Sequence, residues 1–88
     1  MRLIPTGYPP HKTVRGIRFA MRSDALFVHV LVTYAALEGV EPRADSTGDN
    51  LWSRFAKHRG RFEQIANRKY AGRQIEDDGS IAVHPADV

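Results

Sequence analysis

Four basic residues recur along one stretch of the chain with the spacing of an α-helix. They are Arg54, Lys57, Arg61 and Arg68, at positions i, i+3, i+7 and i+14. At about 100° per residue, these positions fall within an arc of about 60° on a helix surface. Lys and Arg neutralise phosphates, so the stripe is a candidate contact surface for nucleic acid or an acidic partner. A solvated helix face that binds nothing specific has the same pattern, and this alternative stays open.

A further basic residue lies on the apolar side of the same predicted helix. Arg59 falls between Phe55 and Phe62, where an aliphatic residue is expected. An unpaired guanidinium there would be costly, so Arg59 either reaches water along its stem or pairs with a carboxylate. We predict a structural ion pair with a carboxylate from outside the helix, and a site for a ligand anion is the alternative. The candidate carboxylates are Asp24, Glu38 and Asp87.

The sequence contains no pattern typical of catalysis or metal binding. Its four histidines show no H-x-x-x-H spacing, and no carboxylate is placed beside them as a further ligand. Its seven glycines are scattered singly, so there is no glycine-rich phosphate loop, and no serine lies in a nucleophile-elbow context. The absence of cysteine excludes disulfides, thiolate zinc sites and a cysteine nucleophile. We therefore expect no enzymatic activity, no metal and no cofactor.

Length and charge set the remaining bounds. The 88 residues suffice for one domain with a small core. No segment has the apolar run of a signal peptide or a membrane span, and the lack of cysteine gives no sign of an oxidising compartment, so we expect a cytoplasmic protein with no membrane partner. The net charge is only +3, but it is segregated along the chain. Basic residues dominate up to Arg22 and again from Asp49 to Arg73, and acidic residues dominate the tail.

The first half of the chain predicts an arm and a hairpin. Residues 1–13 are rich in proline and lack periodicity, which indicates a flexible arm outside a single α+β domain of residues 14–88. Residues 14–22 alternate in polarity, as a half-buried strand does. Residues 26–32 form an apolar run typical of a strand covered on both faces. The two segments predict an antiparallel β-hairpin, and so apolar a strand in so short a chain favours a homodimer.

Two helices follow. Thr33 is predicted to cap a short helix that ends at Gly39. A long amphipathic helix then runs from about 47 to 71, with its cap within residues 46–49 and its end at Gly72. The apolar side of this helix lies opposite the basic stripe, and we expect it to pack on the sheet.

The tail predicts a C-terminal β-hairpin over residues 74–84. A two-residue turn would leave its large apolar residues on opposite faces. A three-residue loop with Gly79 in the left-handed region instead pairs Ile75 with Ile81 and places both on one side with Val83, so we favour this register. The expected fold is therefore α+β, with an antiparallel β-hairpin, a short helix, a long amphipathic helix packed on the sheet and a C-terminal β-hairpin.

Residues in all of these elements also match a family pattern. They are Val14-x-x-Ile17-Arg18-Phe19, Ala36-Leu37-Glu38, Leu51-x-x-x-Phe55-x-x-His58-Arg59, Ile65-Ala66, Lys69-Tyr70 and Asp87. On these residues the chain resembles, from about 14 to 88, domain-of-unknown-function family 1488, a group of small proteobacterial proteins. The resemblance implies a compact α+β domain and carries no activity, cofactor or catalytic residue. Gly60 departs from the polar, helix-favouring residue expected there, which puts the straightness of the helix in question.

The functional expectation from these patterns is a small non-enzymatic accessory or regulatory protein. One form of it binds nucleic acid non-specifically through the basic stripe. The same helix face offers Gln64 and Asn67 as amides that could read bases, too few for sequence recognition. A homodimeric protein-interaction module with no role in nucleic-acid binding is the alternative.

Overall fold

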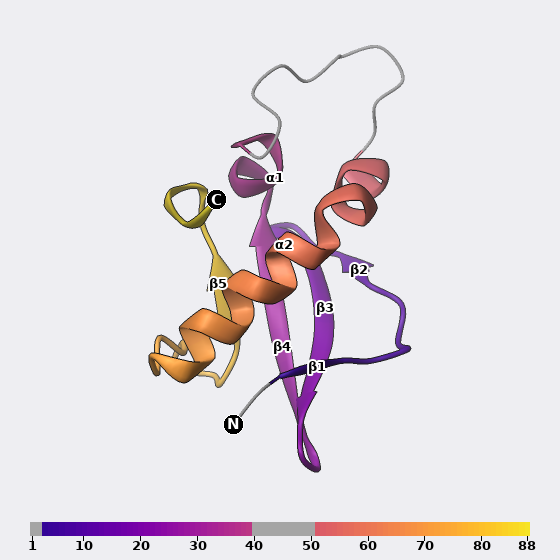
Figure 1. Cartoon of the computed structure of the whole chain (residues 1–88). Coiled ribbons are helices and arrows are strands. Elements are labelled where there is room, and N and C mark those ends of the chain that lie inside the picture. Colours follow the sequence, from indigo (N-terminus) through magenta and orange to yellow (C-terminus); the bar gives the residue numbers. More distant parts are fainter. Residues whose placement is uncertain (1–2, 40–50) are drawn as a thin grey trace.

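The chain folds into a mixed sheet with helices against it (Figure 1). The computed structural model describes residues 3–39 and 51–88. In chain order the elements are β1 (Ile4–Pro5), β2 (His11–Lys12), β3 (Gly16–Ser23), β4 (Leu26–Thr33), α1 (Tyr34–Gly39), α2 (Leu51–Ala71), β5 (Ile81–Val83) and the 3-10 turn η1 (Pro85–Asp87). The strand order is β1-β3-β4-β5, and β2 also pairs with β3. The α+β prediction is therefore confirmed.

The central hairpin is confirmed. β3 and β4 pair antiparallel along their whole length, from Gly16 opposite Thr33 to Ser23 opposite Leu26. The connecting loop has two residues, and Asp24 lies in the left-handed region with φ 54°, as tight hairpin loops require. The alternation in β3 sends Ile17, Phe19 and Met21 to the helix-covered face.

The first 13 residues are not separate from the domain, and this part of the expectation needs correction. β1 and β2 both pair antiparallel with β3. Leu3 is buried in the core, and its backbone N–H and carbonyl bond to the Asn67 side-chain amide at 2.7 and 3.2 Å. Proline-rich composition indicated a lack of local structure, but a single apolar residue with a polar anchor is enough to dock the segment on the sheet.

The predicted cap of α1 is confirmed. Thr33 Oγ1 accepts a hydrogen bond from the Ala36 N–H at 3.1 Å, which satisfies one of the free donors of the first turn. The same hydroxyl donates to the Val83 carbonyl at 3.3 Å. The end of β4 is therefore tied to both α1 and β5.

The long helix is continuous from Leu51 to Ala71, and Gly60 does not interrupt it. The predicted start at 47 and its cap at 46–49 lie outside the described residues. At the other end the Gln74 N–H bonds to the Lys69 carbonyl and the Arg73 N–H to the Tyr70 carbonyl, the Schellman pattern. Gly72 therefore precedes the left-handed C′ position, which Arg73 occupies with φ 58°.

The predicted C-terminal hairpin is only partly correct. Its three-residue loop exists: the Gly79 N–H bonds to the Glu76 carbonyl, the Glu76 N–H bonds to the Ser80 carbonyl, and Gly79 has φ 86°. Pairing stops there, and Ile75 is exposed. β5 instead pairs parallel with β4, Ile81 lying opposite Val30. An isolated two-stranded hairpin is marginal in water, whereas the free edge of β4 lets β5 bury all three of its residues.

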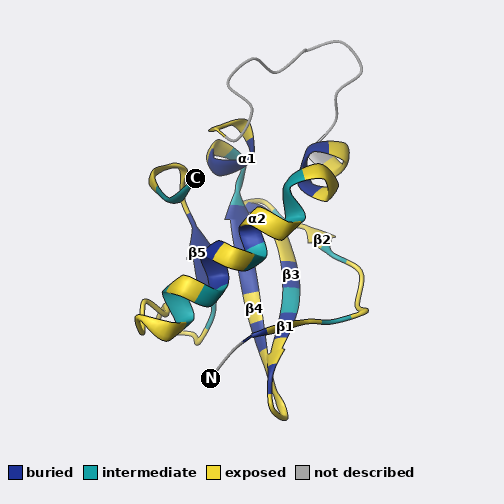
Figure 2. Cartoon of the chain, viewed as in Figure 1, coloured by how far each residue is buried: buried dark blue, intermediate teal, exposed yellow. Residues whose placement is uncertain are grey.

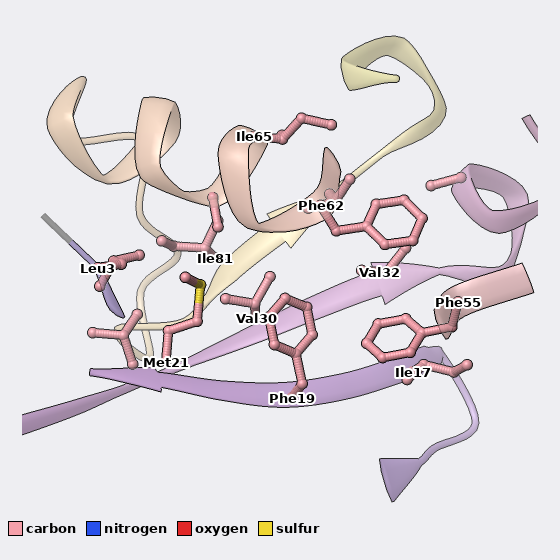
Figure 3. Close-up of a cluster of buried hydrophobic side chains, with 14 of the residues drawn as sticks. Leu3, Ile17, Phe19, Met21, Val30, Val32, Phe55, Phe62, Ile65 and Ile81 are labelled. Carbon is pink, nitrogen blue, oxygen red and sulfur yellow. The ribbon is translucent and has the colours of Figure 1, made fainter. Parts of the chain in front are cut away.

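The core lies between the sheet and α2. Figure 3 shows side chains of β3, β4 and β5 meeting the apolar side of the helix. Phe55 packs edge-on against Phe19 at a centroid distance of 5.4 Å and stacks on Phe62 at 5.8 Å. The buried residues are concentrated where the sheet and α2 face each other, whereas the tip of the β3–β4 hairpin is exposed (Figure 2).

Candidate nucleic-acid interface

Three of the four predicted stripe residues form an exposed row on α2. Lys57, Arg61 and Arg68 are all exposed, on the side of the helix away from Phe55 and Phe62. We call these three cations the α2 ridge. With a rise of about 1.5 Å per residue, the ridge extends over about 16 Å of the helix.

Arg54 does not belong to this exposed row, and its prediction as a contact residue needs correction. Only 6% of its surface is exposed, and its Nη1 lies 3.5 Å from the Leu37 carbonyl oxygen. That carbonyl is in the last turn of α1, where helix carbonyls lack partners within the helix and a cation is favourable. Arg54 lies at the edge of the 60° arc, on the side of α2 that faces α1. Its side chain therefore links the two helices through the Leu37 carbonyl.

Arg59 makes an ion pair, but not with the expected partners. Its Nε lies 3.1 Å from Glu63 Oε2, one turn along the same helix. The partner is none of the predicted carboxylates Asp24, Glu38 and Asp87. Side chains four residues apart on one helix are neighbours, so Glu63 reaches Arg59 without any tertiary contact. The guanidinium also lies 5.3 Å from the Phe19 ring centroid and 5.7 Å from that of Phe55. Arg59 therefore covers the aromatic core at the rim of α2.

Replacing Arg59 by alanine should lower the free energy of unfolding by about 1 to 2 kcal/mol. The sum comprises about 0.5 kcal/mol from the ion pair within the helix, with the remainder from the cation–π contacts and the aliphatic stem. Urea denaturation measures the loss. Glu63→Gln, which removes only the ion pair, should cost about 0.5 kcal/mol or less. A loss above about 3 kcal/mol for Arg59→Ala would contradict this account, since it would require a buried ion pair.

The carboxylate of Asp87 pairs with a cation that the sequence reasoning did not select. Lys69 Nζ lies 2.7 Å from Asp87 Oδ2 and donates to the Ala82 carbonyl at 2.8 Å. Both side chains are largely buried, and the same carboxylate oxygen accepts the His84 N–H at 2.8 Å. The two charges thus link the end of α2, β5 and η1. The signal for this contact was the presence of Lys69 and Asp87 in one family pattern.

Residues 11–83 match the family model described as "Protein of unknown function (DUF1488)". The chain belongs to this family. No curated protein and no solved structure matches it. The match begins within the first 13 residues, at β2, and ends at the last residue of β5.

The family match confirms the resemblance noted in the sequence and leaves function open. Arg59 and Tyr70, which the resemblance marked, lie within the matched region, and Tyr70 is half-buried against the core. Asp87 lies beyond the match. Both marked residues contact the core of this DUF1488 member, which fits a structural role.

Two further properties hold for the part of this DUF1488 chain that the structure describes. None of its helices combines the length and apolar character that crossing a bilayer requires. Within the same residues, no three His, Asp or Glu side chains gather in a way that could hold a metal ion.

Proposed function

We propose that this chain is a small non-enzymatic accessory protein of the cytoplasm that binds nucleic acid through the α2 ridge without sequence preference. The observation that carries the proposal is the exposure of Lys57, Arg61 and Arg68 along one line of α2. Gly60 beside them has open space around it, so a phosphate can approach closely.

The chemistry of the ridge supports backbone contact more than base reading. Phosphate contacts give affinity that depends on salt but carry no sequence information. Of the two amides on this face, Asn67 holds Leu3 through both its oxygen and its nitrogen. Gln64 is exposed and is the remaining amide on the described helix face. One amide is too little for recognition of a sequence.

Duplex DNA labelled with fluorescein should therefore bind weakly, and its affinity should fall steeply with salt. Three neutralised phosphates predict a log–log slope of about −2.7, and each Gln replacement in the ridge should reduce its steepness by about 0.9. Fluorescence anisotropy titrations at several salt concentrations measure the slope. The ridge variant carries Lys57→Gln, Arg61→Gln and Arg68→Gln.

A matched control removes the same charge from another surface. It replaces three exposed arginines on or beside β3, which we call the sheet-face set, by Gln: Arg15, Arg18 and Arg22. Duplex binding should persist in this control. Equal loss in the two triple variants would show that only net charge matters, and absence of binding by the wild type would reject the proposal. A homodimeric interaction module would then be the better reading, with Leu26 and Phe27 as exposed apolar contacts, and sedimentation equilibrium would show a mass above 9.9 kDa.

A further inference from the structure

The sheet has a second face, and part of it is exposed. α2 crosses one face (Figure 1), and the residues that alternate with the core point to the other. Towards β5 this outer face is closed, because Leu31 and Ala82 are buried. Over β3 and the first half of β4 it is exposed. There Arg22 lies opposite Phe27 and Ala20 opposite His29.

Two large aromatic rings meet on this exposed part. Phe27 of β4 and Tyr8 of the segment between β1 and β2 are in edge-to-face contact, with centroids 5.5 Å apart and an interplanar angle of 75°. Their exposed fractions are 52% and 59%. Thr6 helps to place Tyr8, because its hydroxyl donates to the Ala20 carbonyl at 3.0 Å and accepts the Tyr8 N–H at 3.3 Å. The rings are thus held in position while half of their surface stays open to a ligand.

The rings border a groove of about 490 Å³. Its lining includes Tyr8, His11, Phe27 and His29, together with Ala20, whose small side chain takes up little of the space. A volume of this size lies within the range of cavities that accept small organic groups. A single nucleobase is flat and aromatic, and it fits such a space against one of the rings.

The charge around the groove is positive. Arg18 lines it, and Arg22 is exposed beside Phe27 in the sheet register. None of the described residues that line the groove is acidic; Asp78 lies in the adjoining hollow with Arg15 and Arg18. Partial burial and the charge of Arg18 lower the pKa of His29, although Asp78 opposes this shift.

We propose that this groove binds single-stranded nucleic acid, with a base stacked on Phe27 or Tyr8 and the backbone phosphates beside Arg18 and Arg22. Aromatic side chains and cations together make the surfaces on which unpaired bases bind, and the stacking tolerates any base. A duplex cannot use such a surface, because its bases are already stacked on each other. Charge complementarity favours a polyanion over a second copy of this basic chain.

This site goes beyond the proposed function of the α2 ridge and does not depend on it. The groove lies on the face of the sheet away from α2, so the two surfaces use separate residues. Each can be tested with the other intact. A single-stranded probe reports on the groove, and a duplex probe reports on the ridge.

The test is a fluorescence anisotropy titration with a fluorescein-labelled oligothymidine of about ten nucleotides, within the usual site sizes for single strands. Phe27→Ala should weaken binding roughly 5- to 150-fold, the equivalent of one lost base stack. Phe27→Leu should lose most of the affinity as well, because it keeps an apolar side chain but not the ring. Tyr8→Phe should retain it. Trp52→Ala, which removes a 41% exposed aromatic residue from α2, is the matched control and should bind as the wild type does.

The two triple variants complete the design. Replacing the sheet-face set by Gln should reduce the magnitude of the log–log salt slope for the single strand by up to about 2, since each phosphate contributes about 0.7. The ridge variant should retain the ring-dependent part of single-strand binding, because the ridge supplies phosphate contacts but no aromatic ring. Thermal melting of each variant checks that it is folded. The proposal is overturned if the wild type does not bind the oligothymidine, if the aromatic variants bind it equally well, if only the ridge variant loses binding, or if Phe27 instead supports a dimer by sedimentation equilibrium.

Discussion

Replacing Gly16 by alanine should destabilise the protein by about 3 kcal/mol or more, the largest effect expected of any small substitution described here. A Cβ at Gly16 would lie 2.0 Å from the Val32 carbonyl oxygen and 2.8 Å from the Thr33 Cα. Both atoms belong to the backbone of β4, so no side-chain rotation can relieve the overlap. The first residue pair of the β3–β4 ladder would have to separate, close to the Thr33 cap of α1.

The size of this effect matters for so small a domain. Stabilities of about 0.05 to 0.15 kcal/mol per residue imply about 4 to 13 kcal/mol for the whole chain. Urea denaturation should show a lower midpoint for Gly16→Ala with little change in slope. Gly60→Ala is the matched control: a Cβ there meets nothing within 4 Å, and the helix should gain up to about 1 kcal/mol. Effects of the same sign in the two variants would contradict the steric account.

Replacing Lys69 by methionine should cost about 2 to 3 kcal/mol. Methionine keeps the length and apolar character of the stem but removes the ammonium group. The variant would leave the largely buried Asp87 carboxylate without its counter-ion, and the Ala82 carbonyl without the donor at 2.8 Å. Because Lys69 links α2 to β5 and η1, the loss should be accompanied by faster hydrogen exchange in residues 81–88.

The pH dependence of stability should identify the same pair. Burial alone would raise the pKa of Asp87, but hydrogen bonds from Lys69 and the His84 N–H, together with the charge of Lys69, outweigh it and lower the pKa. The stabilisation is therefore complete above the unfolded-state pKa of about 3.9 and is lost as pH falls through the lower folded-state value. Asp87→Asn should be less stable than the wild type at pH 7, by roughly 1 to 2 kcal/mol, and the two should converge at pH values well below 4.

A control variant removes one carboxylate from an exposed turn, so that the change in charge is the same as in Asp87→Asn. Asp77→Asn removes one carboxylate from the loop before Ser80, and its stability should follow the wild type across the same pH range. If Asp87→Asn and the wild type differ equally at pH 7 and in strong acid, the ionised carboxylate is not the stabilising group.

Local patterns in the sequence determined most of the secondary structure. The alternation before Arg22 and the apolar run after it specified β3 and β4, because the period of the side chains alone decides which residues face a core. The helical periodicity of residues 51–71 specified α2 as one continuous helix in spite of Gly60. Thr33 specified the start of α1, and Gly79 the three-residue loop, since capping and positive φ are properties of a few adjacent residues.

Tertiary structure decided what those patterns left open. β5 pairs parallel with β4 because the free edge of that strand offers burial on both faces, which no local signal in residues 74–84 encodes. Leu3 enters the core through its contact with Asn67, 64 residues away in the chain.

The charged residues show the same division. A cation in a sequence has many possible partners, and both local spacing and the packing of the elements choose among them. The i,i+4 spacing within α2 pairs Arg59 with Glu63, whereas packing brings Lys69 to Asp87 and turns Arg54 to the Leu37 carbonyl of α1. The groove depends on packing too: Tyr8 and Phe27 meet because β1 and β2 both pair with β3, a long-range pairing that the period of neither segment could predict.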